Sequence, residues 1–311
     1  MRPAWSVILL TTLIGAGQGL FLALYALDAW DAARGQASLA PLFVAACIAG
    51  SLGLTGAGLA ASFFHLGHPE RAWRSAAMWR TSWLSREVIV LPLFMALVAL
   101  YGLAHWTGRL QGALVAGGFA TAACVALFVC TGMIYACLRF LQEWHTPLTV
   151  ANYLLLGTAS GLTAAAALAA WLQPPLARGY VVAALVAGLL AYLGRLAALA
   201  RNARLRPKST LATAIGVKHP RIVQIAQGAM GGSFNTREFF HGRPREVVRA
   251  ARWTFLALTF PVPGILIILS GSSAALLGTA FLVQYIGLLA ERWYFFAEAR
   301  HPQNLYYQAI A

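Results

Sequence analysis

One part of the chain collects side chains that are suited to binding and protonating a small redox molecule. His65 ends a long apolar run, Arg71 follows it, and Trp83, Arg86 and Glu87 open the next apolar run. An imidazole has an ordinary pKa of about 6.5 and exchanges protons near neutrality. A carboxylate can pass such a proton on to water. These residues therefore form a candidate site for proton-coupled redox chemistry.

A quinone fits this set of side chains. Its flat ring needs apolar or aromatic walls, its two carbonyls need donors such as His, Arg or Trp, and its redox cycle moves two electrons and two protons. A plainer interpretation stands beside it at this stage. Boundary tryptophans anchor helices at the membrane interface, Glu87 suits the first turn of a helix, and His65 would cap the preceding helix.

The elements that carry these residues are membrane spans. The 311 residues are 60% hydrophobic and only 10% charged, and the mean hydropathy is +0.69. A typical soluble domain has about 25% charged residues. The composition predicts an all-α polytopic membrane protein, and it excludes a soluble enzyme, a disulfide scaffold and a disordered regulator.

Eight transmembrane helices in one bundle are expected, because about 20 apolar residues cross a bilayer. The last uncharged run, residues 253–290, is too long for one span, and the Ser-Gly-Ser-Ser turn at 270–273 divides it. Seven spans with a re-entrant element near Pro261 are the alternative. The prediction is one membrane domain over residues 1–311, with spans at about 5–27, 39–64, 86–106, 110–138, 148–171, 179–200, 253–269 and 274–295.

The cations are distributed unequally between the two sides of such a bundle. Only Arg34, Arg109 and Arg178, three of the 23 Lys and Arg residues, fall on one side, and the other 20 fall on the side of both termini. The positive-inside rule places both termini in the cytoplasm, with a basic cytoplasmic loop at 201–252. It also explains the net charge of +14 without nucleic-acid binding. Arg195, near the end of the sixth span, is expected to snorkel toward the same surface.

Cysteines and histidines argue against a bound metal in this chain. The four cysteines lie in apolar runs and form no C-x-x-C motif, so no iron–sulfur cluster is expected and they are interpreted as small buried side chains. No histidine lies in the middle of a span. A haem b held by His65 and His145 is the remaining geometric alternative.

Glycines at 15–19 and 50–58 are expected to let helices approach closely.

The order of several short motifs resembles the membrane-anchor subunit of the DMSO reductase family of molybdenum/iron–sulfur oxidoreductases. They are residues 61–67 (ASFFHLG), Pro69, residues 71–72 (RA), residues 84–87 (LSRE) and an acidic-arginine pair at 291–292 followed by aromatics. The resemblance implies a bacterial inner-membrane complex of three parts. A molybdopterin subunit performs the substrate chemistry, electrons pass through a four-cluster ferredoxin-like iron–sulfur subunit, and the haem-free anchor exchanges electrons with menaquinone or ubiquinone.

The resemblance also assigns roles to individual residues. It implicates His65 and Glu87 in quinol binding, and we add Trp83 at the site, with Arg71 and Arg86 as donors or partners of Glu87. As alternatives, both arginines are loop or snorkelling cations. A secondary transporter would need polar side chains along a midplane path, where the chain supplies only Gln18, Asn152 and Gln284. A purely structural anchor is the further alternative.

The basic loop contains a second segment with a family resemblance. Residues 231–242 (GGSFNTREFFHG) resemble the sulfite-oxidising, quinone-reducing branch of these anchors, which we favour over reduction of an oxide by quinol. Asn235 and Glu238 form a capping pair that predicts a short helix. We expect the segment to dock the iron–sulfur subunit, and an amphipathic helix lying on lipid headgroups is the alternative. The docking candidates are Phe234, Asn235, Arg237, Phe239, Phe240, Arg243 and Arg245.

Overall fold

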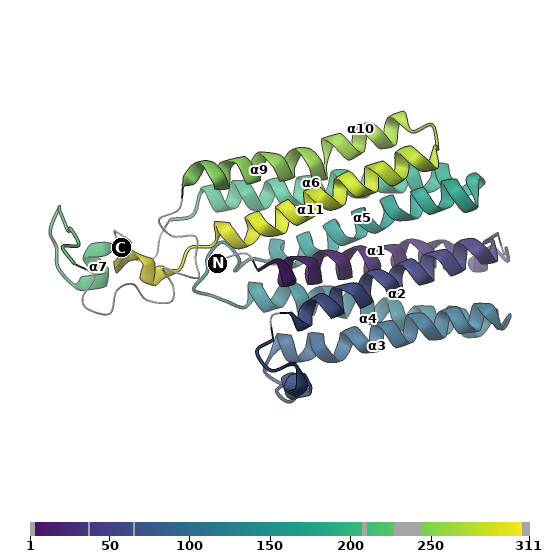
Figure 1. The fold of residues 1–311 in the computed structure, drawn as a ribbon, viewed down its shortest axis with the longest axis horizontal. Helices are drawn as coiled ribbons and strands as arrows, with labels where there is room; N and C mark the ends of the chain where they lie inside the picture. The colour runs from purple at the N-terminus through teal and green to yellow at the C-terminus, as the bar shows by residue number, and fades with distance from the viewer. Residues whose placement is uncertain (1–3, 37, 65, 207–209, 227–243, 307–311) are drawn as a thin grey trace.

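The computed structural model describes residues 4–36, 38–64, 66–206, 210–226 and 244–306. Within these ranges the chain is helical and has no strand, which confirms the all-α prediction (Figure 1). The long helices are α1 (Trp5–Ala33), α2 (Pro41–Phe63), α3 (Trp83–Trp106), α4 (Leu110–Ala136), α5 (Pro147–Leu172), α6 (Pro174–Ala203), α9 (Arg245–Thr259), α10 (Pro261–Leu269) and α11 (Ala274–Glu298). The short ones are α7 (Leu211–Ile215) and the 3-10 helices η1 (Pro69–Ala76) and η2 (Pro302–Tyr306).

Eight segments in the described ranges are long and apolar enough to cross a membrane, which confirms the predicted eight-span bundle. Helices α9 and α10 together form the seventh span, Arg245–Leu269. This span begins at Arg245 rather than near residue 253, because the charged first turns of α9 are helical as well. Helix α6 likewise continues past residue 200 to Ala203.

The proline pair near residue 261 kinks the seventh span and does not form a re-entrant element. Phe260 separates α9 from α10 with a non-helical backbone (φ −121°, ψ −76°). Pro261 has no N–H to donate and its ring clashes with the preceding turn, so the helix breaks there and restarts. Gly287 of α11 packs against the backbone of Leu258 and Thr259 at the break, leaving no room for a side chain.

Helices α1 and α5 lie at the centre of the bundle. Helix α1 packs against α2, α4 and α5, and α5 packs against α1, α6 and α11 (Figure 1). Where α1 meets α5, the backbones of Gly19, Gly157 and Gly161 are so close that a Cβ atom on Gly19 or Gly161 would overlap the facing backbone. Van der Waals packing between small residues drives such association in lipid. The expected close approach is confirmed for Gly19, and its partners on α5, Gly157 and Gly161, were not among the glycines singled out in the sequence.

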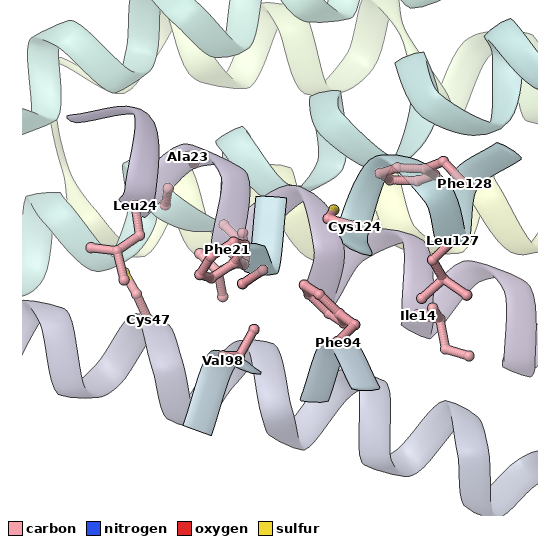
Figure 2. Packing of buried hydrophobic residues seen from close by; sticks show 14 of the residues in the cluster. Ile14, Phe21, Ala23, Leu24, Cys47, Phe94, Val98, Cys124, Leu127 and Phe128 are labelled. Carbon is pink, nitrogen blue, oxygen red and sulfur yellow. The ribbon is translucent and has the colours of Figure 1, made fainter. Parts of the chain in front are cut away.

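Interlocking apolar side chains fill the space between α1, α2, α3 and α4. Figure 2 shows Phe21 and Leu24 of α1 in this cluster with Phe94 and Val98 of α3. Cys47 and Cys124 are buried among them, as expected for small apolar side chains. Cys137 departs from the expectation, because it lies just beyond the end of α4 and is exposed.

The bundle has two chemically different ends. One end, called the basic end below, carries the connections from α2 to α3, α4 to α5 and α6 to α9, the start of α1 and the end of α11. The opposite end, called the far end, carries the connections from α1 to α2, α3 to α4, α5 to α6 and α10 to α11. Helix α7 projects beyond the basic end in Figure 1. The candidate site residues from Arg71 to Glu87 belong to the basic end.

The glycine contact between α1 and α5 predicts a sharp effect of a single methyl group. Gly161→Ala should lower the free energy of unfolding by about 1–3 kcal/mol, the usual cost of overpacking, measured as thermal unfolding in detergent. Gly188→Ala is the matched control, since a Cβ on Gly188 of α6 would meet nothing within 4 Å. Equal unfolding midpoints for the two variants would contradict the close approach.

Candidate functional site

Glu87 lies inside the bundle, near the start of α3. The hydroxyl of Ser82 caps this helix by accepting the backbone N–H of Ser85 at 3.3 Å. The resulting helix turns Glu87 inward, where the residue is 7% exposed. The hydroxyl of Thr131 on α4 donates to Oε1 of Glu87 at 2.5 Å. The carboxyl group therefore has a single neutral partner in the described part of the protein.

A small cavity lies beside Glu87. Its lining comes from α1, α3, α4 and α5 and includes Thr11, Gln18, Thr131 and Tyr153. The cavity has room for roughly one water molecule. A carboxyl group is costly to bury unless it is paired. An inward carboxyl group beside a water-sized space is suited to accepting and passing on a proton, and a quinone ring is too large for this space.

The arginines near Glu87 in the sequence do not pair with it. Arg86 faces outward: its Nε donates to the carbonyl of Trp79 at 2.9 Å, and its guanidinium stacks 4.2 Å from the ring centre of Trp83. Arg71, in η1, lies 3.7 Å from Oε1 of Glu70. The structure thus brings Arg86 and Trp83 together at the surface and leaves Glu87 apart from Arg71 and Arg86.

Aromatic and cationic side chains alternate on the loop between α2 and α3. Arg74 stacks on Trp73 and Arg80 on Trp79, with 5.5 and 5.4 Å between guanidinium carbon and ring centre. Trp73 and Trp79 are exposed. The surface is amphipathic and lies at the same end as the opening turn of α3. It can present both flat apolar faces and hydrogen-bond donors to a ligand or to lipid.

Several predicted residues lie outside the described residues. His65 is one of them, and so are Phe234, Asn235, Arg237, Phe239, Phe240 and Arg243 of the docking segment. Arg245 is described and begins α9 as an exposed residue. Their assignment stays a prediction from the sequence.

The charged residues at the basic end also include a buried cluster that the sequence analysis did not place. Nε of Arg195 on α6 lies 2.8 Å from Oε1 of Glu291 on α11, and Nε of Arg292 lies 3.1 Å from the other oxygen of Glu291. Arg195 is 3% exposed and Glu291 1%. The expectation that Arg195 snorkels to the surface is therefore wrong, because its side chain finds a carboxylate inside the bundle.

Aromatic rings enclose this cluster. The guanidinium of Arg292 stacks 3.8 Å from the ring centre of Tyr153, and that of Arg195 lies 5.3 Å from the ring of Phe255. Cation–π contacts are stronger where water is excluded. A lone charge in a long apolar run was the available sequence signal, because ionisable residues inside membrane spans usually face the bundle interior and are functional.

A second polar cluster lies at the far end. Asp28 accepts hydrogen bonds from the hydroxyl of Tyr101 at 2.8 Å and from Nε2 of His105 at 3.0 Å. It joins the end of α1 to the end of α3. The molecule therefore has polar side chains near both membrane surfaces, and among the described residues only those at the basic end include buried arginines.

The fold defines a multi-span membrane protein, and comparison with known proteins shows which family it belongs to. The chain belongs to the DMSO reductase anchor subunit (DmsC) family, whose model matches residues 1–296. It is a multi-pass bacterial membrane protein. The chain is also similar to a sulfite dehydrogenase subunit of Allochromatium vinosum, with 57% identity over 326 aligned positions that cover all of both chains. The resemblance to the sulfite-dehydrogenase type of anchor is confirmed.

Proposed function

We propose that this protein anchors a molybdopterin/iron–sulfur oxidoreductase and passes electrons between the iron–sulfur subunit and the quinone pool. Membership of the anchor family over residues 1–296 supports the anchoring role. Similarity to a sulfite dehydrogenase subunit over the whole chain favours oxidation of sulfite by the catalytic subunit, with quinone as the electron acceptor.

The observation that carries the quinone role is the buried carboxyl group of Glu87. Its neutral partner Thr131 compensates little of the cost of removing it from water. Ionisable side chains are retained within membrane spans chiefly where they serve transport, proton transfer or ligand binding. Glu87 is also close to the opening turn of α3, where the exposed loop of tryptophans and arginines ends.

The residues divide the work between binding and proton transfer. Trp83 and Arg86 offer a stacked indole and guanidinium at the surface, and Arg71 adds a donor on the same loop. The quinone ring docks against this surface together with His65. Glu87 faces inward, so it does not contact the docked ring. Its role is to transfer protons to and from the quinone.

The site and the electron donor must lie on the same side of the membrane. The cation-rich connections belong to the basic end, and the positive-inside rule places that end in the cytoplasm with both termini. The iron–sulfur subunit docks there against the loop that includes Arg243 and Arg245. Electron transfer then needs only a short gap between the outermost cluster and the docked quinone.

Replacing the carboxyl group of Glu87 tests this function. Glu87→Gln should slow sulfite-dependent quinone reduction by about 10²-fold or more, the usual contribution of an acid–base group. His65→Leu should slow it too. Sulfite oxidation with a soluble artificial acceptor should stay unchanged, since it bypasses the anchor.

Glu246→Gln is the matched control, because this carboxyl group lies at the same end and is exposed in the first turn of α9. If Glu87→Gln and His65→Leu both leave quinone reduction normal in an assembled complex, the quinone site is wrongly placed. If the Glu87 variant loses assembly and both activities together, Glu87 is a structural residue.

The docking role of the basic loop has its own test. Exchanging Arg243, Arg245 and Arg249 for Ser should release the catalytic and iron–sulfur subunits from membranes during a salt wash. The control exchanges the three cations of the far end, Arg34, Arg109 and Arg178, and should retain both subunits. Unchanged retention with the loop variant would favour the lipid-binding interpretation.

A further inference from the structure

The buried charged cluster has no role in the proposed function so far. Reduction of one quinone to quinol consumes two electrons and two protons. The electrons come from the iron–sulfur subunit, and the protons must come from water. Glu87 is almost fully buried, so a route must connect it with an aqueous surface.

The first link of such a route is Tyr153 of α5. This side chain lines the small cavity of Glu87, and it also contacts the guanidinium of Arg292, 3.8 Å from its ring centre. The ring of Tyr135 stacks on it, 5.9 Å between centres. A single tyrosine therefore separates the carboxyl group of Glu87 from the charged cluster.

The second link is the cluster itself. From Arg292 the ion pairs continue to Glu291 at 3.1 Å, to Arg195 at 2.8 Å and to Glu298 at 3.9 Å. Glu298 is 16% exposed, so the row begins in the interior and ends near the surface. Two arginines balance two carboxylates, so the cluster carries no net charge.

The third link is a cleft at the basic end. Glu143, Asn152, Arg195, Glu291 and Arg292 line it, and it has room for roughly one water molecule. The amide oxygen of Asn152 is buried there without a hydrogen-bond partner among the described residues. Buried polar groups of this kind are normally satisfied by water. The cleft can therefore hold the water that carries a proton between side chains.

Glu143 lines this cleft from the connection between α4 and α5. The side chain is partly exposed. Partial burial raises the pKa of Glu143 above its ordinary value, and the nearby carboxylate of Glu298 adds to this rise, while backbone hydrogen bonds and the charge of Arg300 oppose it without cancelling it. A carboxyl group with a raised pKa holds a proton at a higher pH than an ordinary surface carboxylate, which suits a proton acceptor at an entrance.

We propose that Glu143, the cluster of Arg195, Glu291, Arg292 and Glu298, and Tyr153 form the path that carries protons between Glu87 and the aqueous phase at the basic end. This inference rests on the proposed function of Glu87. A purely structural role explains the cluster less well, because apolar side chains usually stabilise a buried contact as well as a buried ion pair does. In quinone reduction the path delivers two protons per quinone, and in quinol oxidation it removes them.

The test uses the outer and inner links, because Glu291→Gln would leave buried arginines unpaired and risks misfolding. In the assembled complex, Glu143→Gln and Tyr153→Phe should each slow quinone reduction by about tenfold, less than the ~10²-fold expected for Glu87 itself. The loss should grow as the pH rises, and the solvent deuterium isotope effect should increase, since proton delivery becomes limiting. Oxidation of sulfite with a soluble acceptor should not change.

Glu143→Asp should restore most of the rate, because it keeps a carboxyl group at the entrance. The path would be overturned if Glu143→Gln and Tyr153→Phe both had normal rates, pH profiles and isotope effects while Glu87→Gln was slow. That result would leave the proposed function intact. A normal Glu87→Gln variant would instead overturn the proposed function itself.

Discussion

An ionised side chain within a bilayer must be neutralised inside the protein, and this constraint organises the basic end of the bundle. Arg195 of α6 meets Glu291 of α11, and Arg292 beside it stacks on Tyr153 of α5. These contacts fix the rotation of α5, α6 and α11 about their helix axes. The close glycine contact between α1 and α5 joins this group to α1, which packs against α2 and α4, the two neighbours of α3. Charge pairing and backbone approach together place the buried carboxyl group of Glu87 beside the cluster.

The two ends of the bundle use polar side chains differently. At the far end, Asp28 is satisfied by Tyr101 and His105, which accounts for the cluster as a bond between α1 and α3. At the basic end, Asn152 keeps an unpartnered buried oxygen within the described structure, and the carboxyl groups form a row rather than a closed pair. A row of exchangeable sites can conduct protons, whereas a closed cluster mainly stabilises.

The number of spans was predictable from the sequence, because each crosses the membrane as a long apolar run whose length follows from bilayer thickness. The directions in which the side chains of these spans face were not predictable from the sequence. Spans that are apolar on all sides carry little information on their rotation, so neighbours such as Arg86 and Glu87 were treated as partners although they face opposite ways. Arg195 was expected at the surface because its partner, Glu291, lies two spans further along the chain and only the fold brings them together.

The central claim is that a quinone docks at the basic end between α2 and α3, beside Glu87. Photolabelling of the assembled complex in membranes with an azidoquinone, followed by mapping of the labelled peptide, tests it most directly. The account predicts label within residues 59–87, lost when excess unlabelled quinone competes. Competed label that maps instead to the far end, around Asp28 and His105, would contradict it.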